Sequence, residues 1–309
     1  MNLSVSRVVG DIMKSKNGYT AGIDWISATR VINDDLSFFA IAKEIQKKYP
    51  FEKFVPGKIY GYKGDFYRGS GCGHMFYGEN RAVFPAREMI QLGGELSDFY
   101  WPKVYFASDN VSRLDLRVDV EIKPAQNDIA EICYDEMQKM KSEGMLNVKT
   151  CSLIKGTKGQ TLYVGSRQSD SYGRLYDKSA EQKEEVHGKI WRYEIELKGR
   201  YAKQAVEKLQ SVFEVGRSAG LRSIGMFVWN WFDSRGVPPM FHFTAKNTQR
   251  IELTSVGEKG NTLVWLRQQV SPTIRRMIAQ GRGGEAFRAL LGLDEINEHV
   301  LREILGSGV

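Results

Sequence analysis

Charged and apolar residues alternate without interruption over residues 113–121, RLDLRVDVE. Because successive side chains of a β-strand point to opposite faces, this pattern predicts a strand with one apolar face and one charged face. The charged face carries Asp115 and Asp119 together with Arg113 and Arg117. Carboxylates next to arginines are side chains that can serve chemistry on phosphate esters.

Two later segments, residues 172–178 and 192–198, alternate in a similar way. The first presents two tyrosines and two cations on one face, and the second presents two glutamates and two cations. If the three strands lie in one sheet, their polar faces form a surface of the kind that metal-assisted phosphoryl transfer requires. Cross-strand salt bridges between the acids and the arginines explain the same pattern, so both interpretations stay open here.

The acidic residues suggest a divalent cation. Asp115 and Asp119 are four residues apart on a strand, roughly 13 Å along it, so they cannot chelate one ion as a simple pair. We expect one of them as a ligand and Glu194 as the second ligand, with Glu196 as a less favoured alternative. Oxygen ligands with few histidines select a hard cation, so Mg²⁺ or Mn²⁺ is the expected metal.

Tyrosine is the candidate nucleophile of this surface. Among the fourteen tyrosines of the chain, Tyr176 shares its face with Arg174 and Lys178. These cations would favour the phenolate and neutralise a phosphate. Tyr172, on the same face, is the alternative.

Composition excludes several other classes of protein. The 309 residues are 42% hydrophobic and 26% charged, which is typical of a globular protein, and no signal peptide or membrane span is recognisable, so we expect a cytoplasmic protein without a membrane partner. Three scattered cysteines without a CxxC motif argue against a disulfide framework or a zinc-cysteine site. The glycines of residues 69–73 lack the Gly-Lys-Ser/Thr of a phosphate-binding loop, and no His-x-His pair is present. A net charge of +7 favours a polyanionic partner.

The periodicities predict an α+β fold. We expect a mostly antiparallel sheet built from two related halves, with helices on one face and a short helical C-terminal segment. Hairpin turns are expected at residues 63–65 and 78–80. The expected strands are 20–31, 113–121, 151–155, 161–166, 171–178 and 189–198, and the expected helices are 37–49, 129–140 and 202–213.

The same patterns suggest how the chain is divided. Residues 1–260 are expected to form a catalytic domain, with halves of about 20–145 and 146–260. Residues 261–309 are expected to be a basic helical segment with short helices at 261–270, 272–280 and 285–305. Arg275 and Arg276 make this segment either a DNA-contacting appendage or a solvated tail.

Six blocks of residues together resemble a known family. In chain order they are GIDWIS at 22–27, RLDLRVD at 113–119, YVGSRQSD at 163–170, RLYDK at 174–178, RYEIELK at 192–198 and TLVWL at 262–266. Their order is similar to that in the replication initiation factors of rolling-circle plasmids, filamentous phages and conjugative elements.

The resemblance implies an enzyme that nicks and rejoins one DNA strand at an origin. Tyr176 would be the nucleophile that becomes joined to the DNA 5′ end and frees a 3′-OH, with Arg174 and Lys178 beside it. Asp115 and Glu194, with Asp119 as a plausible third residue, would hold the metal. The cations expected to contact DNA are Arg113, Arg117, Arg192, Lys198, Arg275 and Arg276.

The resemblance also implies partners. These are double-stranded origin DNA with an extruded single-stranded hairpin, a host helicase and polymerase, and a second copy of the chain in a homodimer. Two alternatives remain. One is a metal-dependent nuclease in which water attacks, and the other is a DNA-binding regulator without catalysis whose acids lie in salt bridges.

Overall fold

The computed structural model describes residues 18–32, 37–69, 72–122, 128–146, 151–156, 159–182, 189–241, 250–254 and 280–282. Contacts divide the chain into two units, Met1–Leu253 and Thr254–Val309. The expected C-terminal helices, except for their residue 280, lie outside the described residues, as do Arg275 and Arg276. The expected boundary after residue 260 lies there too, so it stays a prediction.

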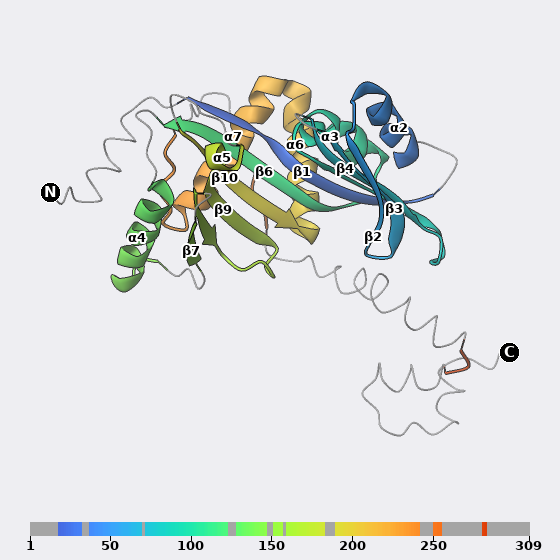
Figure 1. Ribbon diagram of the computed structural model, residues 1–309. Helices are drawn as coiled ribbons and strands as arrows, with labels where there is room; N and C mark the ends of the chain where they lie inside the picture. Colours follow the sequence, from blue (N-terminus) through green and yellow to red (C-terminus); the bar gives the residue numbers. More distant parts are fainter. Residues whose placement is uncertain are drawn as a thin grey trace, which may run out of the picture. The chain divides into compact units, whose positions relative to one another are not determined.

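One ten-stranded sheet organises the first unit, with the strand order β2-β3-β4-β5-β1-β6-β10-β9-β8-β7 (Figure 1). Every neighbouring pair is antiparallel. The strands are β1 (Tyr19–Val31), β2 (Lys53–Ile59), β3 (Tyr62–Gly69), β4 (Gly73–Asn80), β5 (Arg87–Gly93), β6 (Asn110–Ile122), β7 (Cys151–Gly156), β8 (Gly159–Val164), β9 (Ser171–Asp177) and β10 (Lys189–Lys198). The expected α+β class and antiparallel sheet are confirmed, and the first six strands and the last four form two contiguous blocks that meet at β6 and β10.

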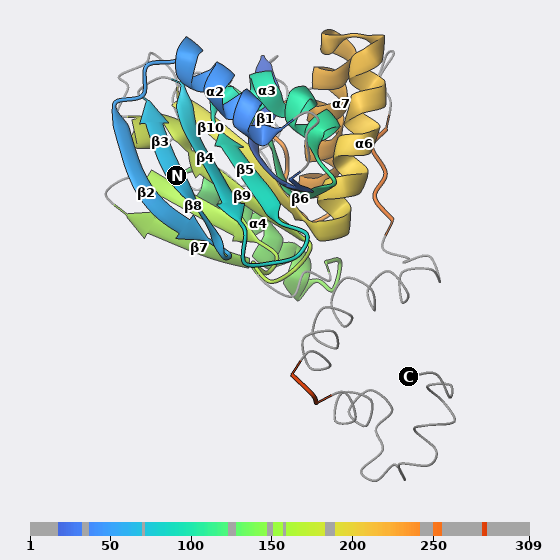
Figure 2. The same cartoon turned by 90° about the vertical axis from the view of Figure 1, so that its right-hand side faces the viewer.

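The helices pack mainly on one face of this sheet. In Figure 2, α2, α3, α6 and α7 lie together on one side of the strands. The described helices are α2 (Phe38–Lys48), α3 (Glu95–Ala107), α4 (Ile129–Ser142), α5 (Lys178–Gln182), α6 (Gly199–Val215) and α7 (Arg217–Asp233). Within the described ranges, none of them combines the length and the apolar character needed to cross a bilayer.

The alternating pattern of β6 determines which of its faces enters the core. Leu114, Leu116, Val118 and Val120 are each 0% exposed and belong to one hydrophobic cluster with side chains from the helices. Burying an aliphatic side chain of this size contributes about 1.5–3 kcal/mol. A shift of one residue in register would move all four into the opposite face, so the register of β6 is strongly specified.

Two parts of the expected fold were wrong or missing. Residues 63–65 lie inside β3, and the turn of this hairpin is formed by Tyr60 and Gly61, both with positive φ (47° and 92°). Residues 78–80 belong to β4 and are not a turn. Gly64 and Gly78 suggested turns, but both are strand residues whose missing Cβ lets neighbouring groups approach closely.

Helices α3 and α7 were not expected. The aromatic, glycine-flanked sequence of α3 looks like strand and turn, although Leu96, Tyr100, Trp101 and Val104 have helical spacing and are buried. Helix α7 is buried on several sides, so it has little amphipathic contrast in its sequence.

Candidate active site

The candidate residues on β6, β9 and β10 share the face of the sheet opposite the helices, and Lys178, expected at the end of the tyrosine strand, is the first residue of α5. β6, β10 and β9 are adjacent, so the hypothesis that the three alternating strands lie in one sheet is confirmed. Directly opposed residues of antiparallel strands point to the same face. The cross-strand rows of this face are Asp115–Glu196–Tyr172, Arg117–Glu194–Arg174 and Asp119–Arg192–Tyr176.

Tyr176 is half-buried and is hydrogen-bonded to the most buried glutamate of the site. Its hydroxyl donates a hydrogen bond of 3.1 Å to Oε2 of Glu194, whose residue exposure is 2%. Oε1 of Glu194 accepts a hydrogen bond from Arg174. The ammonium of Lys178 lies 5.9 Å from the centre of the Tyr176 ring. The phenol therefore has an acceptor for its proton and two cations nearby.

Asp115 is buried in the middle of the same group. It accepts hydrogen bonds of 2.8 and 2.5 Å from Arg113, and its Oδ2 lies 3.9 Å from Nη2 of Arg174. Burial raises the pKa of Asp115 to about 8, with Arg113 opposing this rise and Glu194 and Glu196 adding to it. The same nitrogen of Arg174 is paired with Glu194, so one positive group lies between the two carboxylates.

These contacts test whether the residues suit a divalent cation. In the described part of the chain, no group of three or more His, Cys, Asp or Glu side chains could hold a metal ion. Mg²⁺, however, is commonly held by one or two carboxylates, with water and substrate phosphates completing its shell. Asp115 and Glu194 form such a pair, and they already have a guanidinium between them. Two carboxylates are a donor set that a hard cation can use, and a cation held by both of them would take the place of the Arg174 guanidinium.

Glu196 has a separate set of partners. It pairs with Arg113 at 2.9 Å and with Lys198 at 2.8 Å. Burial acts to raise the pKa of Glu196, but Lys198 and Arg113 bring it below its ordinary value. Lys198 also donates to the carbonyl of Arg167. Glu196 is therefore neutralised by cations at the edge of the site.

Asp119 belongs to a second cluster, away from Asp115. Its oxygens accept from Arg192 at 2.6 and 2.8 Å and from Arg117 at 2.7 Å. Arg192 also donates to Asp24 at 2.6 Å, and Arg117 donates to Asp98 at 2.7 Å. Burial acts to lower the pKa of Arg192, but Asp119 and Asp24 raise it well above its ordinary value. All three acids are therefore engaged with arginines, but only Asp115 and Glu194 share Arg174, and Glu194 alone of the three accepts from Tyr176 in the contacts described above.

Sequence reasoning missed two acids of this second cluster. Asp24 lies where β1 shifts register against β6, and Asp98 belongs to the unexpected helix α3. The backbone N–H of Ile23 donates to Asp98 at 2.6 Å, which places the first turn of α3 beside β1, just past the end of β5. The block GIDWIS contained Asp24, but no pattern linked it to Arg192, 168 residues away.

The alternative nucleophile is less accessible than Tyr176. Tyr172 is 4% exposed, and its ring stacks on Tyr163 with 5.9 Å between centres. Its hydroxyl accepts a hydrogen bond of 3.3 Å from Arg167. Burial raises the pKa of Tyr172, with Arg167 opposing that rise. A buried phenol with a raised pKa is a poorer nucleophile than one open to substrate.

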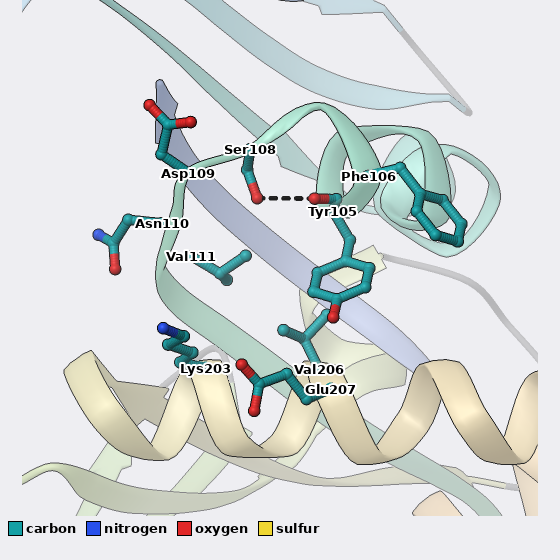
Figure 3. Close-up of a pocket in the computed structure, with 9 residues that line it drawn as sticks. All are labelled: Tyr105, Phe106, Ser108, Asp109, Asn110, Val111, Lys203, Val206 and Glu207. Atoms are coloured by element: carbon teal, nitrogen blue, oxygen red, sulfur yellow. Dashed lines mark hydrogen bonds between the residues drawn. The ribbon is translucent and has the colours of Figure 1, made fainter. Parts of the chain in front are cut away.

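A pocket of about 290 Å³ lies apart from these residues (Figure 3). The end of α3, the start of β6 and α6 form it, and Tyr105, Asp109, Lys203 and Glu207 are among its lining residues. None of the candidate site residues lines it. The pocket is therefore separate from the candidate site.

Comparison with known proteins places the chain in a family. A search of curated proteins found no match. Among solved structures, the chain is similar to a rolling circle replication initiator protein from Geobacillus stearothermophilus, with 16% identity, a TM-score of 0.49, and coverage of 79% of this chain and 91% of that one. Residues 110–291 match the replication initiation factor family, a segment that includes β6, β9 and β10. Because this match covers more than half of the sequence, the chain belongs to the replication initiation factor family.

Proposed function

We propose that the protein initiates rolling-circle replication by nicking and rejoining one strand of origin DNA, with Tyr176 as the nucleophile. The observation that carries this proposal is the hydrogen bond from the Tyr176 hydroxyl to Glu194, in a group that includes Arg174 and Asp115. A nucleophile, an acceptor for its proton and cations for a phosphate are thereby gathered on one face.

In the proposed reaction, Oη of Tyr176 attacks the scissile phosphorus while its proton passes to Glu194. The bond from phosphorus to the 3′ oxygen breaks, and that oxygen leaves as a 3′-OH once it gains a proton. The product is a phosphotyrosyl ester on the 5′ end. Because one phosphodiester replaces another, a 3′-OH can reverse the reaction and rejoin the strand without ATP.

An arginine would bind the phosphate, and a divalent cation would assist. Arg174, which opposes Glu194 across β9 and β10 and is 28% exposed, would neutralise a phosphate near the phenol. Arg192 opposes Tyr176, but its guanidinium is held by Asp119 and Asp24. Asp115 and Glu194 would hold Mg²⁺ or Mn²⁺, which supplies positive charge to the phosphate and the departing oxygen. We also propose, from the family resemblance, a homodimer that acts with a host helicase and polymerase.

The test uses purified protein, Mg²⁺ or Mn²⁺, and supercoiled DNA that carries the origin of its own element. We expect nicked circles with covalently attached protein from the wild type and from Tyr172→Phe, but none from Tyr176→Phe. Nicked circles with a free 5′-phosphate would instead establish water as the nucleophile. Origin binding without nicking, unaffected by a chelator, would establish a regulator.

A further inference from the structure

The open face of the sheet continues from the candidate site over β1, β5, β4, β3 and β2. The row of residues through Asp115 reads Trp25 on β1, Gly93 on β5, His74 on β4, Arg68 on β3 and Lys53 on β2. Phe66 lies on the same face in the next row. We call Trp25, His74, Phe66, Arg68 and Lys53 the aromatic track.

The rings of the track lie over strand backbone. The His74 and Trp25 rings are 4.6 Å apart, and Arg113 of the candidate site lies 5.0 Å from the Trp25 ring. A Cβ atom on Gly93 would be 2.4 Å from the His74 ring and 3.0 Å from the Trp25 ring. A glycine at this position therefore leaves the space that both rings occupy. Gly57 does the same for Phe66, whose ring would be 2.3 Å from a Cβ atom.

The charge of this face suits a polyanion. Lys53 and Arg68 are exposed and opposed across β2 and β3. The acidic residues of β2 to β5 are Asp65, Glu79 and Glu88, and all three occupy alternate positions that point to the other face. Phe66 is 36% exposed, and Trp25 and His74 are each partly exposed. Cations interleaved with accessible rings are the combination that binds single-stranded nucleic acid through phosphates and stacked bases.

The position of the track relative to Tyr176 indicates which part of the DNA it would meet. In an in-line displacement, the leaving oxygen lies opposite the attacking oxygen. From Tyr176 on β9, the direction through Glu194 and Asp115 crosses β10 and β6 and leads to Trp25 on β1. The five strand intervals from β6 to β2 span roughly 24 Å, enough for several nucleotides.

We propose that the aromatic track binds single-stranded DNA on the 5′ side of the nick, the segment that ends in the freed 3′ oxygen. This inference rests on the proposed function for its polarity. The track would retain the 3′-OH end after cleavage, so that the end stays available for extension or rejoining.

Binding is tested with labelled oligodeoxythymidines of about 4 to 16 nucleotides by fluorescence anisotropy. His74→Ala and Phe66→Leu should each weaken binding about five- to hundredfold, the range expected for the loss of one stacked base. Leucine retains apolar cover over Gly57 but has no aromatic face. The matched control is Phe106→Ala, an exposed phenylalanine of α3 that is 65% exposed, and it should bind like the wild type.

Charge is tested in the same assay. Arg68→Ala should reduce the slope of affinity against salt concentration by about one phosphate contact, whereas Lys63→Ala, on the other face of β3, should leave the slope unchanged. Thermal unfolding of each variant shows that it is folded. Equal binding by wild type, His74→Ala and Phe66→Leu would overturn the track, even if the Tyr176 adduct forms.

Polarity is tested with origin oligonucleotides shortened on either side of the nick, measuring how much DNA is needed for adduct formation. The penalty caused by His74→Ala should vanish when the 5′ side is shortened to the single nucleotide that carries the departing 3′ oxygen, and it should persist when the 3′ side is shortened to a single nucleotide. The reverse result would refute the assigned polarity. If the wild type forms no adduct, the proposed function fails, while the oligodeoxythymidine measurements still decide whether the track binds single strands.

Discussion

Replacing Glu194 by glutamine removes one negative charge from the centre of the candidate site and conserves shape. Glu194 accepts from the Tyr176 hydroxyl at 3.1 Å and pairs with Arg174, and its side chain is 2% exposed. A glutamine can accept one of these hydrogen bonds, but it cannot take the phenolic proton. A positioned general base contributes about 10²- to 10⁴-fold in rate, so adduct formation by Glu194→Gln should slow by that factor.

The same substitution has a structural cost that can be measured separately. Breaking a buried ion pair costs about 3–5 kcal/mol when the remaining charge is fully buried. Arg174 is 28% exposed and also lies 3.9 Å from Asp115, so solvent and the second acid reduce this cost. We expect the free energy of unfolding, from urea denaturation, to fall by about 1–3 kcal/mol.

The matched control is Glu196→Gln, two residues along the same strand. Glu196 is paired with Arg113 and Lys198, and its direct cross-strand neighbour on β9 is Tyr172. Its adduct formation, measured in single-turnover reactions at saturating DNA and metal, should stay within about tenfold of the wild type, below the general-base factor. Adduct formation by Glu194→Gln at the wild-type rate, or a larger loss in Glu196→Gln, would refute the assignment of Glu194 as the proton acceptor.

Three further outcomes are expected. Asp119→Asn should lower the free energy of unfolding by about 1–3 kcal/mol, because Arg192 loses a buried partner. The affinity for Mn²⁺, measured by titration calorimetry, should stay unchanged, and a loss of Mn²⁺ binding would make Asp119 a ligand. Gly22→Ala should lower the free energy of unfolding, measured by urea denaturation, by about 1–3 kcal/mol, because the new Cβ would lie 2.5 Å from the Asp98 carboxylate. A variant as stable as the wild type would contradict that contact. Burial lowers the pKa of His74 from its ordinary value of 6.5. The neutral ring therefore contributes stability above pH 6.5, and this contribution is lost as the pH falls below 6.5. His74→Gln should show a smaller decrease in unfolding free energy between about pH 7 and pH 5, and an identical decrease would contradict burial as the cause.

Local periodicity was sufficient where a segment has one buried and one open face. The alternation over residues 113–121 predicted both the strand and the inward side of Leu116 and Val118. The helical spacing of residues 129–140 and 202–213 likewise predicted α4 and α6. These elements follow from the sequence because burial of their apolar face is strong enough to decide their conformation.

Periodicity failed where a glycine or an aromatic residue is compatible with more than one type of secondary structure. Gly64 predicted a turn, but it lies within β3, where a Cβ would be 1.9 Å from the carbonyl oxygen of Tyr77. The turn itself uses Tyr60 with a positive φ, a conformation that a tyrosine rarely adopts. Tertiary contact, and not local preference, therefore chose the position of this hairpin turn.

The sequence by itself determined which side chains share the open face, because the period of a β-strand places Asp115, Glu194 and Tyr176 opposite the apolar residues. Only the tertiary structure decided which carboxylate pairs with which arginine. Strand register placed Arg174 between Asp115 and Glu194, and it joined Asp119 to Arg192. It also brought Asp24 to Arg192 from the far end of the sequence. The period of a strand defines its faces, whereas ion pairs depend on the register between strands, which the packing of the whole sheet sets.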